Sequence, residues 1–396
     1  MKRSNILKNI IQQLHDGESV DQVKDEFKHH FKDVSAAEIA AAEQELVQDG
    51  FTVEEIQTLC DVHATLFEDS VTPVAEPEEL GHPLQVFKEE NQGILDFLDH
   101  QFNIVFKKYL EQPQNQQEHL KLAIHELLKI DKHYTRKENL MFPYLEKAGI
   151  TTPPKVMWGV DDEIRELLKK SYTSVSDGNV KSAKKQIEKA IKKIVSMVTK
   201  ENEILAPLLV KHITEEEWKV IAQESVHIGY VFTGNRENAS PSDAMAWVKK
   251  GSANMEPRND APIQLPSGFF QQKELTMLLN TLPCDITFVG TDDKVHFFSE
   301  QKERVFPRTR TIIGRDVADC HPPKSIDVVN GIIQSFKNGE KDSETFWIQM
   351  GDKFILIRYF AVRDEEGKYL GVLEVTEDIA PLRKLEGEKR LLSDTK

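Results

Sequence analysis

The chain has 396 residues, which is long enough for two to four domains of ordinary size. It carries 51 Lys and Arg residues against 66 Asp and Glu residues, a formal net charge of −15 at pH 7. This balance excludes an ordinary nucleic-acid-binding protein, because such proteins need a basic face to replace phosphate counterions. The 39% of hydrophobic residues fall in dense periodic runs, so wholesale disorder is excluded as well.

The cysteines and the N-terminal residues predict the compartment. Three cysteines are too few, and odd in number, for a disulfide framework, which favours a reducing environment. The first 19 residues lack the apolar stretch of a secretory signal, and no run approaches the ~18 apolar residues of a membrane span. We therefore expect a cytoplasmic protein without a membrane span.

Apolar periodicity predicts short helices in the first 70 residues. Ser35 and Glu38 have the spacing of a capping box before an alanine-rich helix, which Asp49-Gly50 ends. We predict a small helical domain over residues 1–70, followed by a Pro/Glu-rich linker up to residue 81.

The next region, residues 82–230, is dominated by long helical patterns. Four of them have short connections and a fifth is shorter; they fall at about 84–110, 116–147, 155–175, 179–212 and 215–227. Four helices of this length with short connections predict an up-down four-helix bundle. The polar residues 231–262, rich in Pro, Gly, Asn and Ser, are predicted to be an interdomain linker.

The pattern changes in residues 263–396. A short helix is expected at 271–282, a longer one at 322–336, and five strands at 285–290, 294–300, 344–350, 354–362 and 369–378. Two strands, then helices, then three hairpin-connected strands predict a five-stranded antiparallel sheet with helices on one face. A charged helix is expected over residues 380–392. The predicted fold class is multidomain, α plus α+β.

Histidines and inward carboxylates suggest a metal site. Six of the thirteen histidines fall between residues 63 and 133, and none falls from 134 to 211. Each helix of the bundle places one carboxylate on its apolar face, and His133 accompanies them; these are Glu90, Glu138, Asp161 and Glu201. A divalent cation would offset the cost of burying such charges. The alternative, that these carboxylates lie on a solvated rim, stays open.

The segment from His133 to Pro143 carries a family resemblance. His133-Tyr-Thr-Arg-Lys-Glu138, followed by an apolar run ending in Phe142-Pro143, resembles the second-helix motif of the hemerythrin-like (HHE cation-binding) family. Lys200-Glu201 through Ala206-Pro207 resembles a repeat of it. The family implies a four-helix bundle with a non-haem di-iron centre. Its members store or sense oxygen, or handle iron and nitric oxide.

The departures from this pattern fall on its ligands. Met197 stands where the repeat has a histidine, Lys137 stands for the first glutamate of the pair, and Glu90 and Asp161 stand where histidines are expected. A histidine-rich, oxygen-carrying centre is therefore not expected. A carboxylate-rich site with Glu90, His133, Glu138, Asp161 and Glu201 as metal ligands, or a lost site, stays open.

The resemblance extends over nearly the whole chain. Leu59-Cys60-Asp-Val-His63 and Gly81-His82-Pro83 resemble stretches of bacterial proteins that join an N-terminal DUF438 domain to a hemerythrin-like bundle and a C-terminal PAS domain. Cys60, His63 and His82 are candidates for a second metal or haem site. The alternative is a buried cysteine and histidines packed between domains.

Residues 283–380 resemble a PAS domain. The resemblance implies a pocket between sheet and helices, which holds haem, flavin or a small metabolite in some members. Candidate pocket residues are His296, Cys320 and His321. The alternative for His321 is that it and the neighbouring prolines cap the following helix. A homodimer through the PAS domain and the C-terminal helix is also expected from the resemblance.

The leading functional prediction is a cytoplasmic sensor or regulator. Its bundle would bind a cation, with iron as the leading candidate, and its PAS domain would sense a ligand or redox state. A metal-free protein-interaction adaptor with a degenerate hemerythrin site, and an iron- or nitric-oxide-handling protein, stay open. The sequence has no P-loop, dinucleotide, serine-hydrolase or zincin motif, so an enzyme is not expected. An unidentified protein partner would receive the output.

Overall fold

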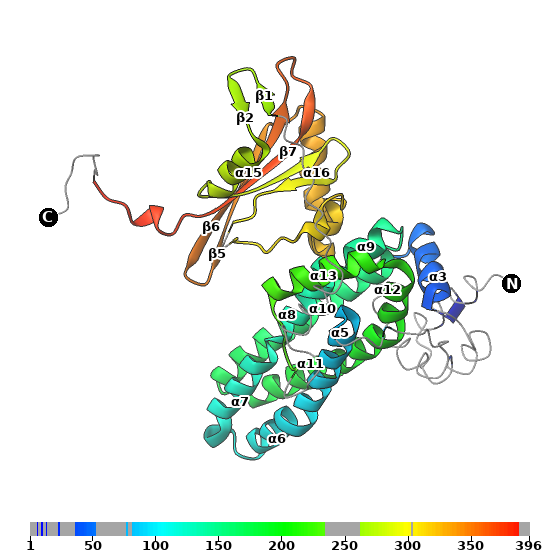
Figure 1. Ribbon diagram of the computed structural model, residues 1–396. Helices are drawn as coiled ribbons and strands as arrows, with labels where there is room; N and C mark the ends of the chain where they lie inside the picture. Colours follow the sequence, from blue (N-terminus) through cyan, green and yellow to red (C-terminus); the bar gives the residue numbers. More distant parts are fainter. Residues whose placement is uncertain are drawn as a thin grey trace. The chain divides into compact units, whose positions relative to one another are not determined.

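The computed structural model describes residues 36–52, 81–233, 262–301 and 304–387, with the isolated positions Ile6, Asn9, Ile10, Gln13, Val23 and Pro77. The chain divides into two compact units, Met1–Asn254 and Met255–Lys396 (Figure 1). Cys60 and His63 lie outside the described residues, as does most of the predicted linker. Among the described helices, none is long and apolar enough to cross a bilayer.

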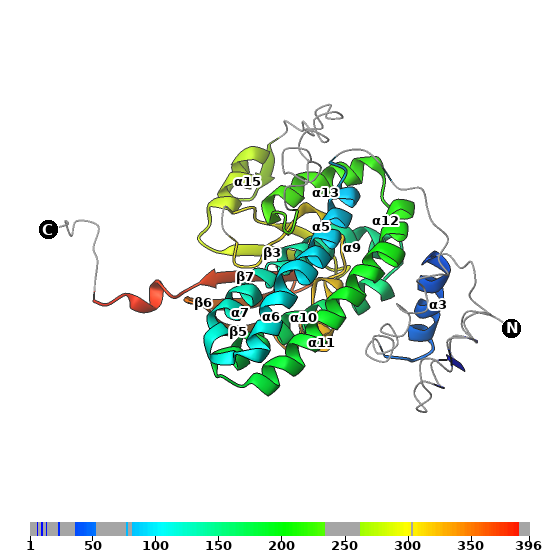
Figure 2. The same ribbon diagram turned by 90° about the horizontal axis from the view of Figure 1, so that it is seen from below.

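The first unit contains the predicted bundle. Its first long helix consists of α5 (Pro83–Phe97), a π-helical turn (Leu98–Phe102) and α6 (Asn103–Glu111), and it is continuous in both views (Figures 1 and 2). The second consists of α7 (Pro113–Leu127), α8 (Ile130–Arg136), a π-helical turn (Lys137–Met141) and α9 (Phe142–Lys147). The third is α10 (Thr152–Ser176). The fourth consists of α11 (Val180–Lys200), a π-helical turn (Glu201–Leu205) and α12 (Ala206–His212), and α13 (Glu215–Ile228) follows.

Local chemistry explains where these helices begin and end. Pro83 and Pro113 occupy first turns, where proline loses no helical hydrogen bond. Gly178, with φ of +69°, lies in the connection between α10 and α11. Thr214 and Glu217 form a capping box at the start of α13. The predicted four-helix bundle is confirmed.

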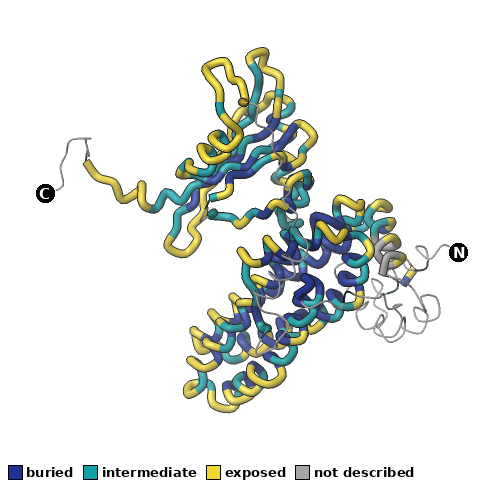
Figure 3. The backbone as a smooth tube through the Cα atoms, in the orientation of Figure 1, coloured by how far each residue is buried: buried dark blue, intermediate teal, exposed yellow. Residues whose placement is uncertain are grey.

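The interior of the bundle is an apolar core that includes Phe87, Ile94, Ile164 and Leu205. Buried stretches of backbone are coloured dark blue in Figure 3. Helix α3 (Ala36–Gln48) packs against α10 and α12. There, the side-chain oxygen of Gln44 accepts hydrogen bonds from the amide and the hydroxyl of Thr152, at 3.1 and 2.8 Å. The Thr152 amide is one of the backbone donors that lack a partner within the helix at the start of α10, so Gln44 supplies an acceptor for it from another part of the chain.

The second unit contains a five-stranded antiparallel sheet in the order β4-β3-β7-β6-β5. Its strands are β3 (Asp285–Gly290), β4 (Val295–Phe298), β5 (Ser343–Met350), β6 (Lys353–Arg363) and β7 (Tyr369–Asp378). Ile333 and Phe336 of α16 (Ile326–Lys337) pack with Val289 and Val372 in the core of this unit. The predicted α plus α+β fold class is confirmed.

Two details differ from the sequence prediction. A hairpin of β1 (Ile263–Leu265) and β2 (Gly268–Phe270) precedes α15 (Gln272–Thr281), and its three-residue strands are too short to give a periodic signal. The predicted C-terminal helix is only a short 3-10 turn (Leu382–Lys384) within the described residues, and residues 385–387 are not helical.

Candidate functional site

The predicted carboxylates converge in the interior of the bundle. Glu90, Asp161 and Glu201 have no exposed surface, Glu138 is 5% exposed, and His133 is fully buried beside them. They come from α5, α10, α8 and two of the π-helical turns. The alternative of a solvated rim therefore does not hold for these side chains.

The π-helical turns of the second and fourth long helices begin at residues of this site. One starts at Lys137 and the other at Glu201, at equivalent places in the second and fourth long helices. A π-helical turn widens the helix by one residue, so neighbouring side chains turn towards directions that α-helical periodicity does not predict. Lys137 and Glu138 are consequently both buried although they are adjacent in sequence.

Lys137 is the basic residue at the centre of the site. Its Nζ donates hydrogen bonds to Asp161 Oδ1 at 2.9 Å and to Glu201 Oε1 at 2.5 Å. Burial alone would lower the pKa of Lys137, but the two carboxylates outweigh burial and raise the pKa above its ordinary value. The side chain therefore stays an ammonium inside the bundle.

Glu90 is held by Arg136 and His133. The Arg136 guanidinium donates to Glu90, and burial lowers the Arg136 pKa to about 10, which leaves it charged at neutral pH. Nδ1 of His133 is 2.8 Å from Glu90 Oε2, and its Nε2 is 3.1 Å from Glu201 Oε2. The ring of His133 thus lies between two carboxylates that come from different helices. The ring also stacks on Phe87, with centroids 4.2 Å apart.

Glu138 is paired with Arg165 of α10. Two guanidinium nitrogens donate to its two carboxylate oxygens, at 2.8 and 3.0 Å, which is the bidentate geometry of a strong pair.

The pKa values of the buried carboxylates are shifted in different directions. Burial raises the pKa of Glu138 in spite of Arg165. Burial, together with the charge of Glu138, raises the pKa of Asp161 well above its ordinary value. Burial alone would also raise the pKa of Glu201, but Lys137 and His133 outweigh burial and hold it at about 2.

The segment that leaves α13 is fastened to the same network. The amide of Val231 donates to Glu90 Oε1 at 2.8 Å, and Arg136 donates to the carbonyl of Gly229 at 3.1 Å. The Arg136 guanidinium also lies over the Tyr230 ring, 4.7 Å from its centroid. Sequence reasoning missed this segment and missed the basic residues Arg136, Lys137 and Arg165 as members of the site.

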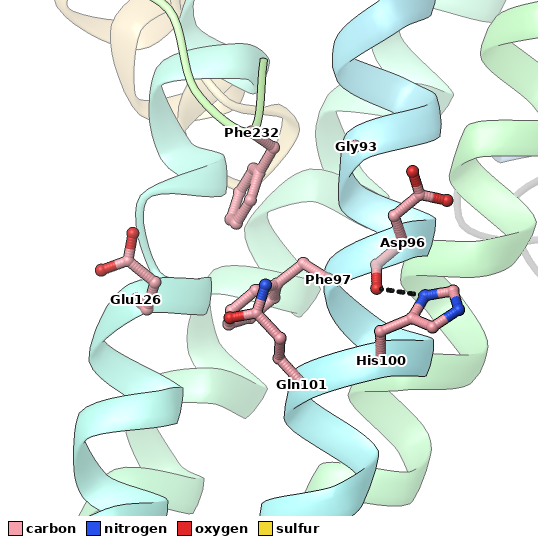
Figure 4. A pocket seen from close by; sticks show the side chains of 7 residues that line it. All are labelled: Gly93, Asp96, Phe97, His100, Gln101, Glu126 and Phe232. Atoms are coloured by element: carbon pink, nitrogen blue, oxygen red, sulfur yellow. Dashed lines mark hydrogen bonds between the residues drawn. The ribbon is translucent and has the colours of Figure 1, made fainter. Parts of the chain in front are cut away.

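A surface pocket of about 630 Å³ lies beside this segment. It is lined by Gly93, Asp96, Phe97, His100, Gln101, Glu126 and Phe232 (Figure 4). The Phe97 and Phe232 rings are 5.2 Å apart between centroids.

Of the three residues of the predicted second metal or haem site, only His82 lies within the described residues. Its Nδ1 accepts a hydrogen bond from the amide of Leu84 at 3.2 Å, which caps α5, and its ring lies 4.8 Å from the ring of Trp218. Cys60 and His63 lie outside the described residues, so their part in a site stays a prediction.

One of the three candidate residues in the second unit lines a cavity. The cavity between the sheet and α16 is small, about 30 Å³, and is lined by Val289, Val317, His321, Val329, Ile332, Ile333, Tyr359, Val372 and Glu374. Burial lowers the pKa of His321 to about 4, helped by Arg308 and Arg315 and opposed by Glu374. His296 is half-exposed and pairs with Asp292 at 2.9 Å, and Cys320 lies beside Asp316; neither lines this cavity.

Fold and site together define a multidomain protein with a helical bundle, an ionisable core and an α+β domain enclosing a small cavity. The hemerythrin HHE cation binding domain matches residues 82–209, the PAS domain matches residues 275–380, and DUF438, a family of unknown function, matches residues 7–73. The chain therefore joins a DUF438 region, a hemerythrin HHE domain and a C-terminal PAS domain. The resemblance seen in the sequence is confirmed.

The solved structures similar to this chain that follow each cover between a quarter and a third of it. A C-terminal domain from Streptococcus mutans is 34% identical, covers 33% of this chain and is itself covered completely, with a TM-score of 0.31. A sensory box sensor histidine kinase from Vibrio cholerae is 19% identical, with 26% of this chain and 88% of that chain covered and a TM-score of 0.21. A PAS domain from Colwellia psychrerythraea is 17% identical, with 28% and 97% covered and a TM-score of 0.23. No functionally curated protein matches the chain.

The residues of the bundle site do not fit the cation that its family name implies. Each of the four acidic side chains pairs with a lysine or an arginine of the same chain. Lys137 bridges two of the carboxylates, Arg136 holds a third and Arg165 the fourth. Among the described residues, no three His, Cys, Asp or Glu side chains are grouped so that they would hold one metal ion. The assignment of these residues as metal ligands stays a prediction.

The ion pairs predict a large stability effect at Glu201. We expect Glu201→Gln to lower the free energy of unfolding by about 3 kcal/mol, because it leaves Lys137 and His133 buried with one carboxylate fewer. Urea unfolding of the full chain, followed by far-UV circular dichroism, measures this. Glu203→Gln, on the exposed side of the same turn, is the matched control and should stay within about 0.5 kcal/mol of the wild type. Equal stability of the two variants would contradict the network described above.

The lowered pKa of His321 predicts a pH dependence of the PAS domain. Between its folded pKa of about 4 and its ordinary value of about 6.5, the unfolded chain binds a proton that the folded chain does not. Stability is therefore lost as the pH falls through this window, by about 2 kcal/mol from pH 7 to pH 5. Calorimetry of the full chain at several pH values should show this loss for the wild type. A His321→Gln variant with the same pH dependence would argue against the assignment.

Proposed function

We propose that this protein is a regulator in which the PAS domain is the sensing module and the hemerythrin-like bundle responds to it. In this proposal the segment Gly229–Phe232, which leads from the bundle towards the PAS domain, connects the two. The bundle works through its ion-pair core, without iron. The observation that carries the proposal is the buried hydrogen bond from the Val231 amide to Glu90, which is 2.8 Å long.

Glu90 is the reason that this contact matters. It stands where the hemerythrin-like family has a ligand, and here it binds Arg136, His133 and the backbone of the exit segment. A change in the core that moves Glu90 therefore acts directly on the segment, and displacement of the segment acts on the core. This is the reciprocity that coupling between two sites requires.

The conformation of Phe232 supports the same reading. Its φ is +54°, which is rare for a residue with a bulky side chain and costs free energy. Such strain persists only where surrounding contacts hold it. Phe232 lies directly over Gly93 of α5, so closely that a Cβ at Gly93 would be 1.8 Å from the Phe232 carbonyl oxygen. The segment is thus held against a helix surface that only glycine permits.

The other functions considered from the sequence receive less support. An iron- or nitric-oxide-handling protein needs ligands that are not already bound to lysine and arginine. The adaptor function agrees with the ion-paired core but makes no use of the fastened segment. An output partner and a homodimer remain predictions of the proposal.

Gly93→Ala tests the connection without changing any charge of the network. We expect the added methyl group to displace Phe232, so that amide exchange in residues 229–233 becomes about tenfold faster, a local loss of about 1.4 kcal/mol. Hydrogen exchange with mass spectrometry on the full chain measures this. If the domains are coupled, exchange also changes in α16 and β7 around the PAS cavity.

Gln92→Ala, one residue earlier and exposed, is the matched control and should leave both regions unchanged. The reciprocal variant Ile333→Ala, in the core of the PAS domain, should change exchange at residues 229–233. Changes that stay within the mutated domain in both variants would refute the regulatory proposal.

A further inference from the structure

We propose that the Lys137 ammonium is a built-in substitute for a metal ion, and that this one side chain keeps divalent metals out of the carboxylate centre of the bundle. The inference rests on the part of the proposed function in which the bundle works without iron. Metal content and domain coupling are measured separately, so the failure of one is distinguishable from the failure of the other. The inference also rests on the position of Lys137, on its confinement and on the donor atoms around it.

The position is that of a bridging cation. Nζ lies between Asp161 on α10 and Glu201 at the start of a π-helical turn, at 2.9 and 2.5 Å from their oxygens. Carboxylates from facing helices are the groups that hold metals in bundle cores. A divalent ion bound to the same two oxygens would need the space that the ammonium fills.

Lys137 is confined to this position. Its side chain has no exposed surface, and its Nζ lies 4.5 Å from the centroid of the Tyr134 ring and 6.0 Å from that of Phe142. A metal ion would face an ammonium in contact distance, in a medium that screens charge poorly. Releasing the lysine towards water would require the bundle to open.

The donors beside Lys137 are of the types that bind metals, and a carboxylate in place of the ammonium would add one more to them. Asp161 and Glu201 bind Lys137, and His133 lies 3.1 Å from Glu201. The charge of Glu138, the next residue along the chain, acts on Asp161. The second carboxylate oxygen of Asp161 is buried and receives no hydrogen bond from a described donor. Imidazole and carboxylate groups are ligands for iron and zinc.

Lys137→Glu tests this inference, because it exchanges the ammonium for one more carboxylate. The wild type, Lys137→Glu and Lys137→Gln are purified as full chains, loaded anaerobically with ferrous chloride or with zinc chloride, and freed of unbound metal by gel filtration. Metal per chain is measured by mass spectrometry, and the melting temperature is measured with and without metal. Lys193→Glu is the matched control, since Lys193 is a second nearly buried lysine and pairs with Glu163 instead.

We expect substoichiometric metal in the wild type and the Lys193→Glu control, without a shift in melting temperature. Lys137→Glu should bind about tenfold more metal than the wild type and should melt at a higher temperature when metal is present. If Lys137→Glu does not fold, Lys137→Gln gives the same comparison with the charge alone removed. Stoichiometric metal in the wild type overturns the inference, and so does a folded Lys137 variant that gains no metal.

Discussion

Buried carboxylates need positive charge beside them, and this requirement shapes the centre of the bundle. An unpaired carboxylate in a protein interior costs several kcal/mol, or it takes up a proton. Here the four inward carboxylates obtain their partners from side chains of the same chain: Lys137 bridges Asp161 and Glu201, Arg136 holds Glu90 and Arg165 holds Glu138. The bundle thereby has the fold of a hemerythrin HHE domain, and lysine and arginine side chains of the chain itself pair with its buried carboxylates.

The same pairing extends beyond the core. Because Glu90 also accepts the Val231 amide and Arg136 also binds the Gly229 carbonyl, the segment leaving the bundle depends on the charges inside it. The occupancy of a metal site depends on the concentration of the metal, whereas Lys137 is part of the chain and is always present. In the proposed function, the bundle therefore responds to its exit segment rather than to the supply of a metal.

The sequence predicted most of the fold and about half of the site. The apolar periodicity of the long helices and the hairpin signals of the sheet gave the architecture, because burial imposes a regular spacing on such elements. Glu90, Glu138, Asp161 and Glu201 were found because each interrupts an apolar stripe. Lys137 was missed as a core residue because the π-helical turn that begins there breaks α-helical phasing. The contacts of Val231 and Phe232 were missed because they join positions about 140 residues apart, which no local pattern encodes.

A measurement of the protonation state and surroundings of the Lys137 side chain in solution tests the central claim most directly. Nuclear magnetic resonance of the full chain with lysine labelled at Nζ, assigned through loss of the signal in Lys137→Arg, reports whether the group is an ammonium and what lies beside it. The account predicts an ammonium signal that is protected from solvent exchange, persists to pH 10 and is not broadened by added Mn²⁺. A neutral amine, or strong broadening of the signal by stoichiometric Mn²⁺, would show that a metal ion enters the centre and would contradict the account.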